Sequence, residues 1–174
     1  RKDRENMIRA GIIGATGYAG AEILRILAVH PNVEVKWIGS RSYADQKIAA
    51  VYGNLFHVVD LSLINDDTEQ MKKEILKLAD EVDVIFTATP QGACAGLVSR
   101  ELLEKVKIID MSADFRLKDV SVYEAWYKIH HASPEFLPEA VYGLVEINRK
   151  DIPSARLLAN PGCYTTCSIL TAYP

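Results

Sequence analysis

The amino-acid sequence predicts an α/β fold in which helices cover both faces of a parallel sheet. Short apolar runs, typical of buried parallel strands, alternate along the chain with segments whose apolar residues recur at helical spacing. Strands joined through helices need right-handed crossovers and therefore run parallel. A glycine-rich turn between the first apolar run and the first helical segment favours a Rossmann-like, doubly wound sheet.

The first part of the chain predicts two strands and a helix. Residues 1–6 are mostly charged and lack periodicity, so we expect a disordered tail there. Met7–Ile13 is an apolar run with a glycine directly after it, which predicts a strand. Apolar residues at helical spacing predict a helix over Gly17–His30, which the following Pro-Asn pair ends. Val33–Ile38 alternates with a period of two and predicts the second strand.

The middle of the chain is less regular before the alternation resumes. Residues 39–65 predict a loop with a short helix near Lys47–Tyr52 and an extended stretch over Phe56–Leu63. Asp67–Asp80 has apolar residues at helical spacing, with acids at its start and lysines later, which predicts a helix. Val82–Ala88 predicts another strand.

The last part of the chain continues the same alternation of helices and extended segments. The expected elements are, in order, a helix over Gln91–Lys105, a strand over Val106–Asp110, a helix over Glu124–His131, extended stretches over Val141–Val145 and Arg156–Ala159, and an apolar helix from Cys163 onward.

A turn of the form G-x-x-G-x-x-G joins the first expected strand to the first helix. Glycine allows a tight turn and the close approach of a ligand, and the free amides at a helix start suit a pyrophosphate. A tight loop without a ligand is the alternative, which the strand before and the helix after the turn disfavour. The residues expected to bind a dinucleotide here are Gly14, Thr16, Gly17, Tyr18 and Gly20.

The residues after the second strand favour NADP as that dinucleotide. Folds selective for NAD place an acid at this point, about 20 residues after the glycine turn, to bond the ribose 2′-hydroxyl. In this chain the positions hold Ser40, Arg41 and Ser42, and their hydroxyls and guanidinium suit a 2′-phosphate. The alternative for Arg41 is a solvated cation in a polar loop.

A third loop, after the expected strand Val82–Ala88, should border the same cofactor. Ligands of such sheets bind at the carboxyl ends of the strands, so we expect Pro90 and Gly92 to line the site. The alternative is a plain turn between a strand and a helix.

Cys163 is the candidate nucleophile. It follows a Pro-Gly turn and begins an expected helix, where the helix dipole and free backbone amides stabilise a thiolate. The same amides could hold an oxyanion while the sulfur attacks a carbonyl and forms a thioester. The alternative, a small buried residue, is the one we favour for Cys94 and Cys167.

Two further polar clusters follow extended segments. Ser112 and Arg116 belong to the first, and their side chains suit a carboxylate or a phosphate. Residues 142–149 form the second. A helix cap for Ser112 and surface ion pairs for the arginines are equally good interpretations of the residues alone. For His130 and His131 we expect a solvated helix end.

The composition excludes several classes of function. The 174 residues carry a formal net charge of −3, so no broad basic surface for nucleic acid or anionic lipid is expected. No apolar run is long enough to span a membrane, and no signal-type stretch follows the charged start. The 3 cysteines lack zinc-site spacing and suit a reducing cytoplasm. We expect no metal, no nucleic-acid partner and no membrane contact.

The motifs together resemble one family, the N-acetyl-γ-glutamyl-phosphate reductases. The strings that carry the resemblance are Gly14-Ala-Thr-Gly-Tyr-Ala-Gly20, Ser40-Arg41-Ser42, Asp110-Met-Ser-Ala-Asp-Phe-Arg-Leu117, Tyr142-Gly-Leu-x-Glu146 with Asn148-Arg149, and Asn160-Pro-Gly-Cys-Tyr164. The specific strings are Ser112-Ala-Asp-Phe-Arg116 and Asn160-Pro-Gly-Cys-Tyr164, whereas many dehydrogenases share the glycine turn. Thr165, Gln91 and Val145 depart from residues usual in the family.

The resemblance implies an activity in arginine biosynthesis. NADPH would reduce N-acetyl-γ-glutamyl phosphate to N-acetylglutamate semialdehyde with release of phosphate, and Cys163 would carry the thioester. The full-length enzyme would be a cytoplasmic homo-oligomer that uses a histidine located after the cysteine. The residues that the resemblance places around the substrate are Ser112, Arg116, Glu146 and Asn160.

Family members run to about twice the length of this chain, and no histidine follows Cys163 here. We therefore expect an NADP-binding domain over residues 7–160 and the start of a truncated catalytic domain over residues 161–174, with the second, substrate and dimerisation domain largely absent. Two alternatives stay open: an NADP-binding fragment without activity, and a reductase of a related aminoadipyl or aspartyl phosphate.

Overall fold

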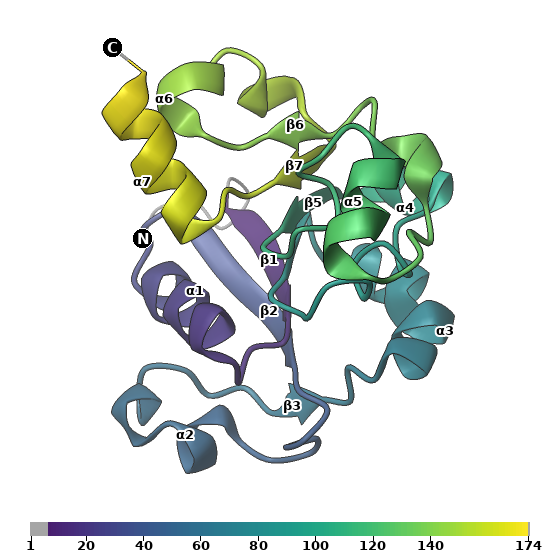
Figure 1. The fold of residues 1–174 in the computed structure, drawn as a ribbon. Coiled ribbons are helices and arrows are strands. Elements are labelled where there is room, and N and C mark those ends of the chain that lie inside the picture. The colour runs from purple at the N-terminus through teal and green to yellow at the C-terminus, as the bar shows by residue number, and fades with distance from the viewer. Residues whose placement is uncertain (1–6, 174) are drawn as a thin grey trace.

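A computed structural model describes residues 7–173, which form one seven-stranded sheet with helices on both faces (Figure 1). The tail expected over residues 1–6 lies outside the described residues. The strand order is β3-β2-β1-β4-β5-β7-β6, and every pair is parallel. The strands are β1 (Ile8–Ile13), β2 (Val33–Gly39), β3 (Leu63–Ile64), β4 (Val84–Thr87), β5 (Lys107–Asp110), β6 (Val141–Tyr142) and β7 (Leu157–Ala159). The predicted α/β fold is confirmed.

Within residues 7–173, seven α-helices and three short 3-10 helices accompany these strands. The α-helices are α1 (Tyr18–Ala28), α2 (Ile48–Val51), α3 (Thr68–Ala79), α4 (Arg100–Lys105), α5 (Val120–Tyr127), α6 (Val145–Asn148) and α7 (Cys163–Ala172). The 3-10 helices are η2 (Gly53–Leu55), η3 (Pro134–Phe136) and η4 (Ile152–Ser154). No helix within residues 7–173 combines the length and the apolar character that crossing a membrane requires.

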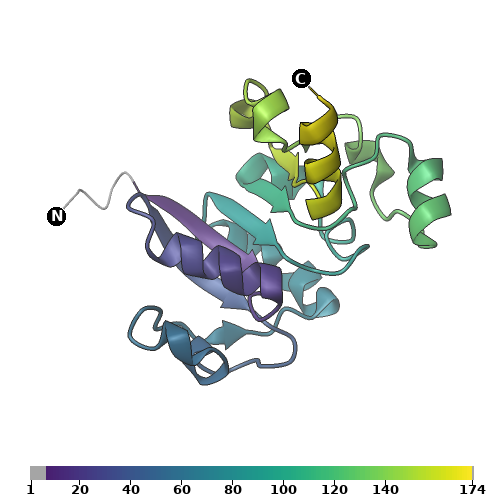
Figure 2. The same cartoon turned by 60° about the vertical axis from the view of Figure 1, so that its left-hand side comes forward.

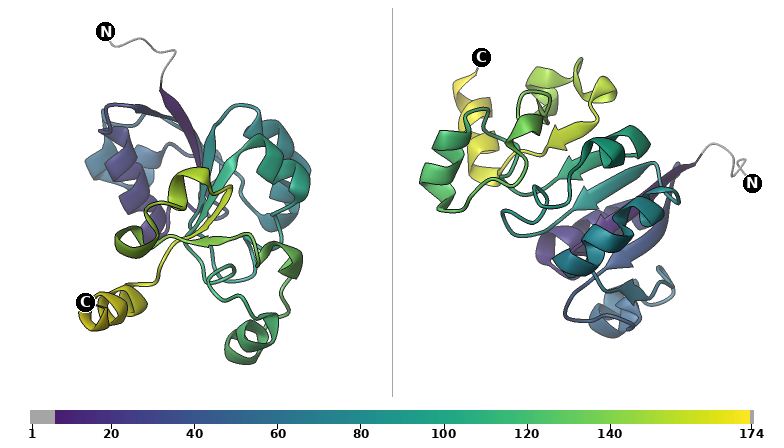
Figure 3. Two further views of the ribbon diagram at one scale, coloured as in Figure 1. Left: turned by 90° about the horizontal axis from the view of Figure 1, so that it is seen from above. Right: turned by 90° about the vertical axis from the view of Figure 1, so that its right-hand side faces the viewer.

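The strand order separates two apolar cores, one on each face. The chain moves outward from β1 to β2 and β3, so α1 and α2 cover one face, and Leu24 and Ile48 pack there against Ile12. The crossover from β3 to β4 then brings α3 and α4 to the other face (Figure 3), where Met71 and Leu102 are buried. Because the chain continues to opposite sides of the sheet from the neighbouring strands β1 and β4, the loops that follow them separate and leave room for a ligand.

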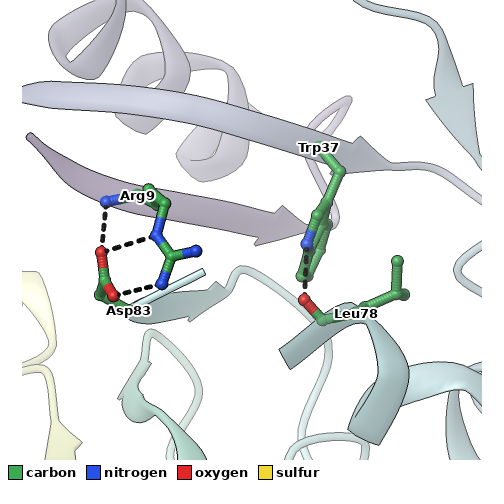
Figure 4. Close-up of polar contacts among 4 residues, drawn as sticks. All are labelled: Arg9, Trp37, Leu78 and Asp83. Atoms are coloured by element: carbon green, nitrogen blue, oxygen red, sulfur yellow. Dashed lines mark hydrogen bonds and ion pairs between the residues drawn. The ribbon is translucent and has the colours of Figure 1, made fainter. Parts of the chain in front are cut away.

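The amino ends of β1 and β4 are tied by an exposed ion pair. The Arg9 guanidinium donates two hydrogen bonds to the Asp83 carboxylate, which also accepts from the Arg9 amide (Figure 4). Further along β2, the indole of Trp37 lies over Gly11 and donates to the Leu78 carbonyl at 3.2 Å, which links the sheet to α3. A side chain on Gly11 would collide with that indole.

The helix expected over Gln91–Lys105 is wrong in its first half. Residues 91–97 form successive turns, and α4 begins only at Arg100. Gly92 has φ +88°, which an α-helix does not accept, and Ser99 is extended and caps the new helix by accepting from the Leu102 amide. The chain therefore leaves β4 through a shaped loop.

Three other boundaries also differ from the expectations. The helix expected over Glu124–His131 is α5, which begins four residues earlier because Asp119 caps it. The extended stretch expected over Val141–Val145 ends at Tyr142 and gives way to α6. Within Phe56–Leu63, residues 56–58 form a turn, residues 59–61 are irregular, Ser62 forms an isolated bridge with Lys47, and only Leu63 joins a strand.

Candidate active site

A pocket of about 550 Å³ lies at the carboxyl ends of β1, β2, β3 and β4. Four loops line it, one after each of these strands. Eight of the ten residues expected to bind a dinucleotide lie in its wall: Gly14, Thr16, Gly17, Ser40, Arg41, Ser42, Pro90 and Gly92. Their roles stay predictions, but the fold brings together three loops that the sequence keeps 20 to 50 residues apart, an approximate separation set by the crossovers between parallel strands.

Two of the expected binding residues, Gly20 and Tyr18, lie outside the pocket wall. Gly20 is buried beneath it, and a Cβ there would lie 2.1 Å from the Gly14 carbonyl oxygen. Tyr18, the first residue of α1, is 93% exposed and does not line the pocket. Gly14 itself has φ +80°, and a Cβ on it would lie 2.3 Å from the Ala88 carbonyl oxygen. No side chain caps α1, so its first amides face the turn without a side-chain acceptor.

The loop after β2 places its polar groups at the pocket. Ser40 is buried, and its hydroxyl lies 2.7 Å from that of Thr16. Arg41 is exposed, and its guanidinium makes no ion pair with any of residues 7–173. A pocket with an uncommitted guanidinium beside two hydroxyls suits a phosphate group.

Asp66 is a pocket residue that the sequence analysis missed. It follows β3 by two residues, between the irregular segment over residues 39–65 and the helix expected over Asp67–Asp80. Its carboxylate accepts a hydrogen bond from the Gly14 amide at 2.7 Å. Partial burial raises the pKa of this carboxyl, and the nearby Arg41 guanidinium opposes that change. An acid directly after a strand of a parallel sheet is the signal that could have identified it.

The wall formed by the loop after β4 rests on a buried carboxylate. Asp114 is fully buried and accepts from the Gly92 amide at 2.7 Å, the Ala95 amide at 2.9 Å and the Tyr123 hydroxyl at 2.7 Å. Burial, followed by the bond to Asp114, raises the pKa of Tyr123, so its hydroxyl keeps the proton that it donates. Asp114 thus fixes the turns that precede α4.

Ser112 lies in the same buried network and not in the pocket wall. Its hydroxyl donates to Asp110 at 2.8 Å and accepts from the Asp114 amide at 3.1 Å. Asp110 also accepts from the Thr87 hydroxyl at 2.9 Å, which ties the ends of β4 and β5 together. Burial raises the pKa of Asp110. The Ser112 hydroxyl already makes two hydrogen bonds within the protein. The substrate role expected for Ser112 stays a prediction.

The solvated helix end expected for both histidines is wrong for His131. His130 is exposed, but His131 is fully buried and lies edge-on against Phe115 and Tyr123. Its Nε2 donates to the Asp114 carbonyl at 2.7 Å, and its Nδ1 accepts from the Ser133 amide at 3.2 Å. The imidazole therefore forms a structural bridge between residues 114 and 133.

Cys163 is the first residue of α7 and is exposed, with Gly162 as the helix cap. Arg116 fixes the turn before it: Nε donates to the Asn160 carbonyl at 2.8 Å and Nη2 to the Met111 carbonyl at 2.7 Å. A Cβ on Gly162 would lie 2.9 Å from Nη1 of Arg116, so the guanidinium sits directly against this turn. The structure thus brings two of the predicted substrate residues, Arg116 and Asn160, to the cysteine.

Glu146, the fourth predicted substrate residue, is exposed in the first turn of α6. This helix and α7 lie beyond the β6–β7 edge of the sheet, and neither has a buried residue (Figure 2). The Tyr142 hydroxyl, at the end of β6, donates to Thr165 of α7 at 3.3 Å, and this hydrogen bond connects β6 to α7.

The other two cysteines differ from each other. Cys94 is buried, as expected, and burial raises its pKa well above the ordinary value. Cys167 is exposed, so the buried position expected for it is wrong. Within residues 7–173, no group of three metal-ligating side chains is arranged to hold a metal ion.

Residues 9–155 match the family described as "Semialdehyde dehydrogenase, NAD binding domain". The chain is 60% identical over 169 residues to an N-acetyl-gamma-glutamyl-phosphate reductase of Lachnospira eligens. The matched residues make up 97% of this chain and 47% of that protein. The reductase of the same name from Campylobacter jejuni is 47% identical over 167 residues, 96% of this chain and 46% of that protein. The chain therefore spans about half the length of the curated relatives it matches.

Two solved structures share the fold. Aspartate semialdehyde dehydrogenase II from Vibrio cholerae matches with a TM-score of 0.62 at 17% identity, over 94% of this chain and 44% of that one. Aspartate semialdehyde dehydrogenase with NADP from Candida albicans matches with a TM-score of 0.57 at 14% identity, over 94% of this chain and 45% of that one. At these identities the likeness concerns the fold alone.

Proposed function

The chain belongs to the semialdehyde dehydrogenase family, whose NAD binding domain it matches over residues 9–155, and from this premise we propose that it is the NADP-binding part of an N-acetyl-γ-glutamyl-phosphate reductase. In this proposal residues 7–160 bind the cofactor, and residues 161–174 begin the catalytic part. The proposed protein is a cytoplasmic homo-oligomer of arginine biosynthesis. The 60% identity to a reductase of that name supports the choice of substrate.

The pocket has the features that a dinucleotide requires. The glycine turn leaves no space for side chains at Gly14 and Gly20, the start of α1 has no side-chain cap, and Arg41 is available for a 2′-phosphate. When bound, the reduced nicotinamide cofactor supplies a hydride. The uncommitted guanidinium of Arg41 is the observation that favours NADP over NAD.

The proposed chemistry takes place at Cys163. Its thiolate attacks the acyl carbon of the substrate, a C–S bond forms, and the C–O bond to phosphate breaks as phosphate leaves with the electron pair. The amides at the start of α7 stabilise the oxyanion, and Nη1 of Arg116 offers a charged donor beside the same turn. Reduction of the thioester returns the C–S electron pair to the cysteine, which is then ready for another substrate.

A phosphate-dependent assay tests the proposal. We expect the full-length protein that contains this chain to reduce NADP in the presence of N-acetylglutamate semialdehyde and phosphate, measured by the absorbance of the reduced cofactor. Faster turnover with an aspartyl or aminoadipyl semialdehyde would transfer the proposal to a related reductase. Binding of NADP by the full-length protein without any turnover would instead support a binding module.

The cysteine assignment has its own test. We expect iodoacetamide to label Cys163 ahead of Cys94, because Cys163 is exposed and Cys94 is buried, and ahead of Cys167, which is exposed but lies one helical turn from the start of α7. Cys163→Ala should abolish turnover of the full-length protein, while Cys167→Ala serves as the matched control and should retain it. Preferential labelling of Cys94 or Cys167 would refute the assignment.

A further inference from the structure

A carboxylate covers the carboxyl end of β2, although β2 itself ends without an acid. A Cβ built on Gly39, the last residue of β2, would lie 2.7 Å from the Cβ and 2.9 Å from Oδ2 of Asp66. Asp66 comes from the neighbouring strand, two residues after β3, and reaches across the space that Gly39 leaves open. The position that an acid after the second strand ordinarily fills is therefore occupied from β3.

The contacts of Asp66 hold its carboxylate inside the pocket. Oδ2 accepts from the Gly14 amide at 2.7 Å, which anchors the side chain to the first residue of the glycine turn. Besides Gly14, the backbone amide of Asp66 itself acts on the carboxylate. The carboxylate lines the same pocket as Arg41 and Ser42, so one anion and one cation face the same ligand space.

We propose that Asp66 is a specificity-determining residue, which binds the adenosine ribose of the cofactor and opposes Arg41 in the choice between NAD and NADP. A carboxylate accepts hydrogen bonds from ribose hydroxyls and repels a 2′-phosphate, whereas a guanidinium attracts that phosphate. The preference for NADP then depends on the balance of two charges. This inference rests on the proposed cofactor binding and specifies how the pocket discriminates.

The charges that face Asp66 are few, which makes the balance measurable. Arg41 is the cation that acts on its carboxyl, and Asp67 is the neighbouring anion. Asp67 lies in the same pocket wall but uses its carboxylate to cap α3, where it accepts from the Glu69 amide at 3.1 Å. Asp67 is therefore a control of equal charge whose carboxylate has a different structural task.

The test measures the dissociation constants of NADP and NAD for the protein and its variants by titration calorimetry. Asp66→Asn keeps the volume of the side chain and an oxygen for the Gly14 amide, but it removes the charge. We expect the preference for NADP, the ratio of the two constants, to rise by about fivefold or more, as removal of one unit charge at roughly 4 Å implies in water. Asp66→Glu keeps the charge and should keep the ratio within about twofold.

Each outcome bears on a different claim. An unchanged ratio in Asp66→Asn, or an equal rise in Asp67→Asn, which leaves an adequate helix cap, would overturn the role of Asp66 while wild-type binding still supported the proposed function. Wild-type protein that binds neither nucleotide would overturn both. If Asp66→Asn does not fold, Asp66→Ser takes its place, because it also removes the charge and keeps a hydroxyl oxygen that can accept from the Gly14 amide. A rise in the NADP preference of that variant supports the role, and an unchanged ratio overturns it.

Discussion

The carboxyl edge of the sheet consists of two halves that use their polar groups differently. Beyond β1, β2 and β3, the pocket wall presents an exposed Arg41, a partly buried Asp66 and the uncapped start of α1. Beyond β4 and β5, Asp110 and Asp114 are fully buried, and each accepts three hydrogen bonds from the protein itself. The first half presents its polar groups to the ligand space, whereas the second uses its carboxylates to hold the loop after β4, which completes the pocket wall.

The motifs of the sequence accordingly have two different tasks in the structure: some line the pocket, and others position the loops around it. The glycine turn and Ser40-Arg41-Ser42 line the pocket directly. The string over residues 110–116 acts mainly inward: Asp114 fixes the loop that carries Gly92, and Arg116 fixes the turn before Cys163. One short segment therefore sets the position of both the cofactor wall and the cysteine. A motif residue of this kind positions the site and need not contact the substrate.

The largest effect should come from breaking the buried half. Asp114→Ala leaves the Gly92 amide, the Ala95 amide and the Tyr123 hydroxyl without an acceptor in a buried place. We expect a loss of about 3–5 kcal/mol in the free energy of unfolding, measured by urea denaturation. Tyr123→Phe is the matched control, since it removes one donor together with its need for an acceptor, and should cost about 1 kcal/mol. Equal losses in both variants would contradict the dominant role of Asp114.

The next effect should come from the open half, at Gly14. Gly14→Ala forces a side chain into a residue with φ +80° and against the Ala88 carbonyl. We expect a loss of about 1–3 kcal/mol in stability and a weakening of NADP binding of about tenfold or more, as a misplaced turn implies. Gly53→Ala is the control, because nothing lies within 4 Å of a Cβ there and Gly53 is not among the pocket residues. If both variants bind NADP equally well, the turn does not hold the cofactor.

A smaller effect on stability, with a clear effect on binding, should distinguish the open half from the buried one. Arg41→Ala changes an exposed side chain without an ion pair in the described part of the chain, so the free energy of unfolding should change by less than about 0.5 kcal/mol. Its affinity for NADP should fall, while its affinity for NAD changes little. Equal losses for the two nucleotides would remove the 2′-phosphate role.

The smallest effect is expected at the amino ends of β1 and β4, where Arg9 and Asp83 form an exposed ion pair. The hydrogen bond from Arg9 lowers the pKa of Asp83. The pair therefore stabilises the fold at pH values above the ordinary aspartate pKa, and the contribution disappears as the pH falls through the lowered pKa. Asp83→Asn should lower Tm slightly at pH 7, and the difference from wild type should shrink in acid. A difference that grows in acid would contradict the assignment.

The sequence predicted the fold and most of the pocket because those features are local. Alternating apolar runs indicate strands and helices, and the glycine turn stands beside the strand and helix that it joins. Asp66 escaped prediction because its position depends on which strand lies next to β2, a property of the sheet order. The helix expected over Gln91–Lys105 failed for a related reason, since the Asp114 carboxylate that takes up the Gly92 and Ala95 amides lies 19 to 22 residues away in the chain.

The two strands at the edges of this sheet, β3 and β6, are each only two residues long. An edge strand exposes unpaired amides and carbonyls that another chain can use to extend the sheet, and this is a common route to aggregation. Two residues offer too few such groups for a stable added strand, because isolated pairs of short strands are marginal in water. The central strands that carry the site are thus shielded from edge-to-edge association, and the described domain should tolerate high concentration without forming fibres.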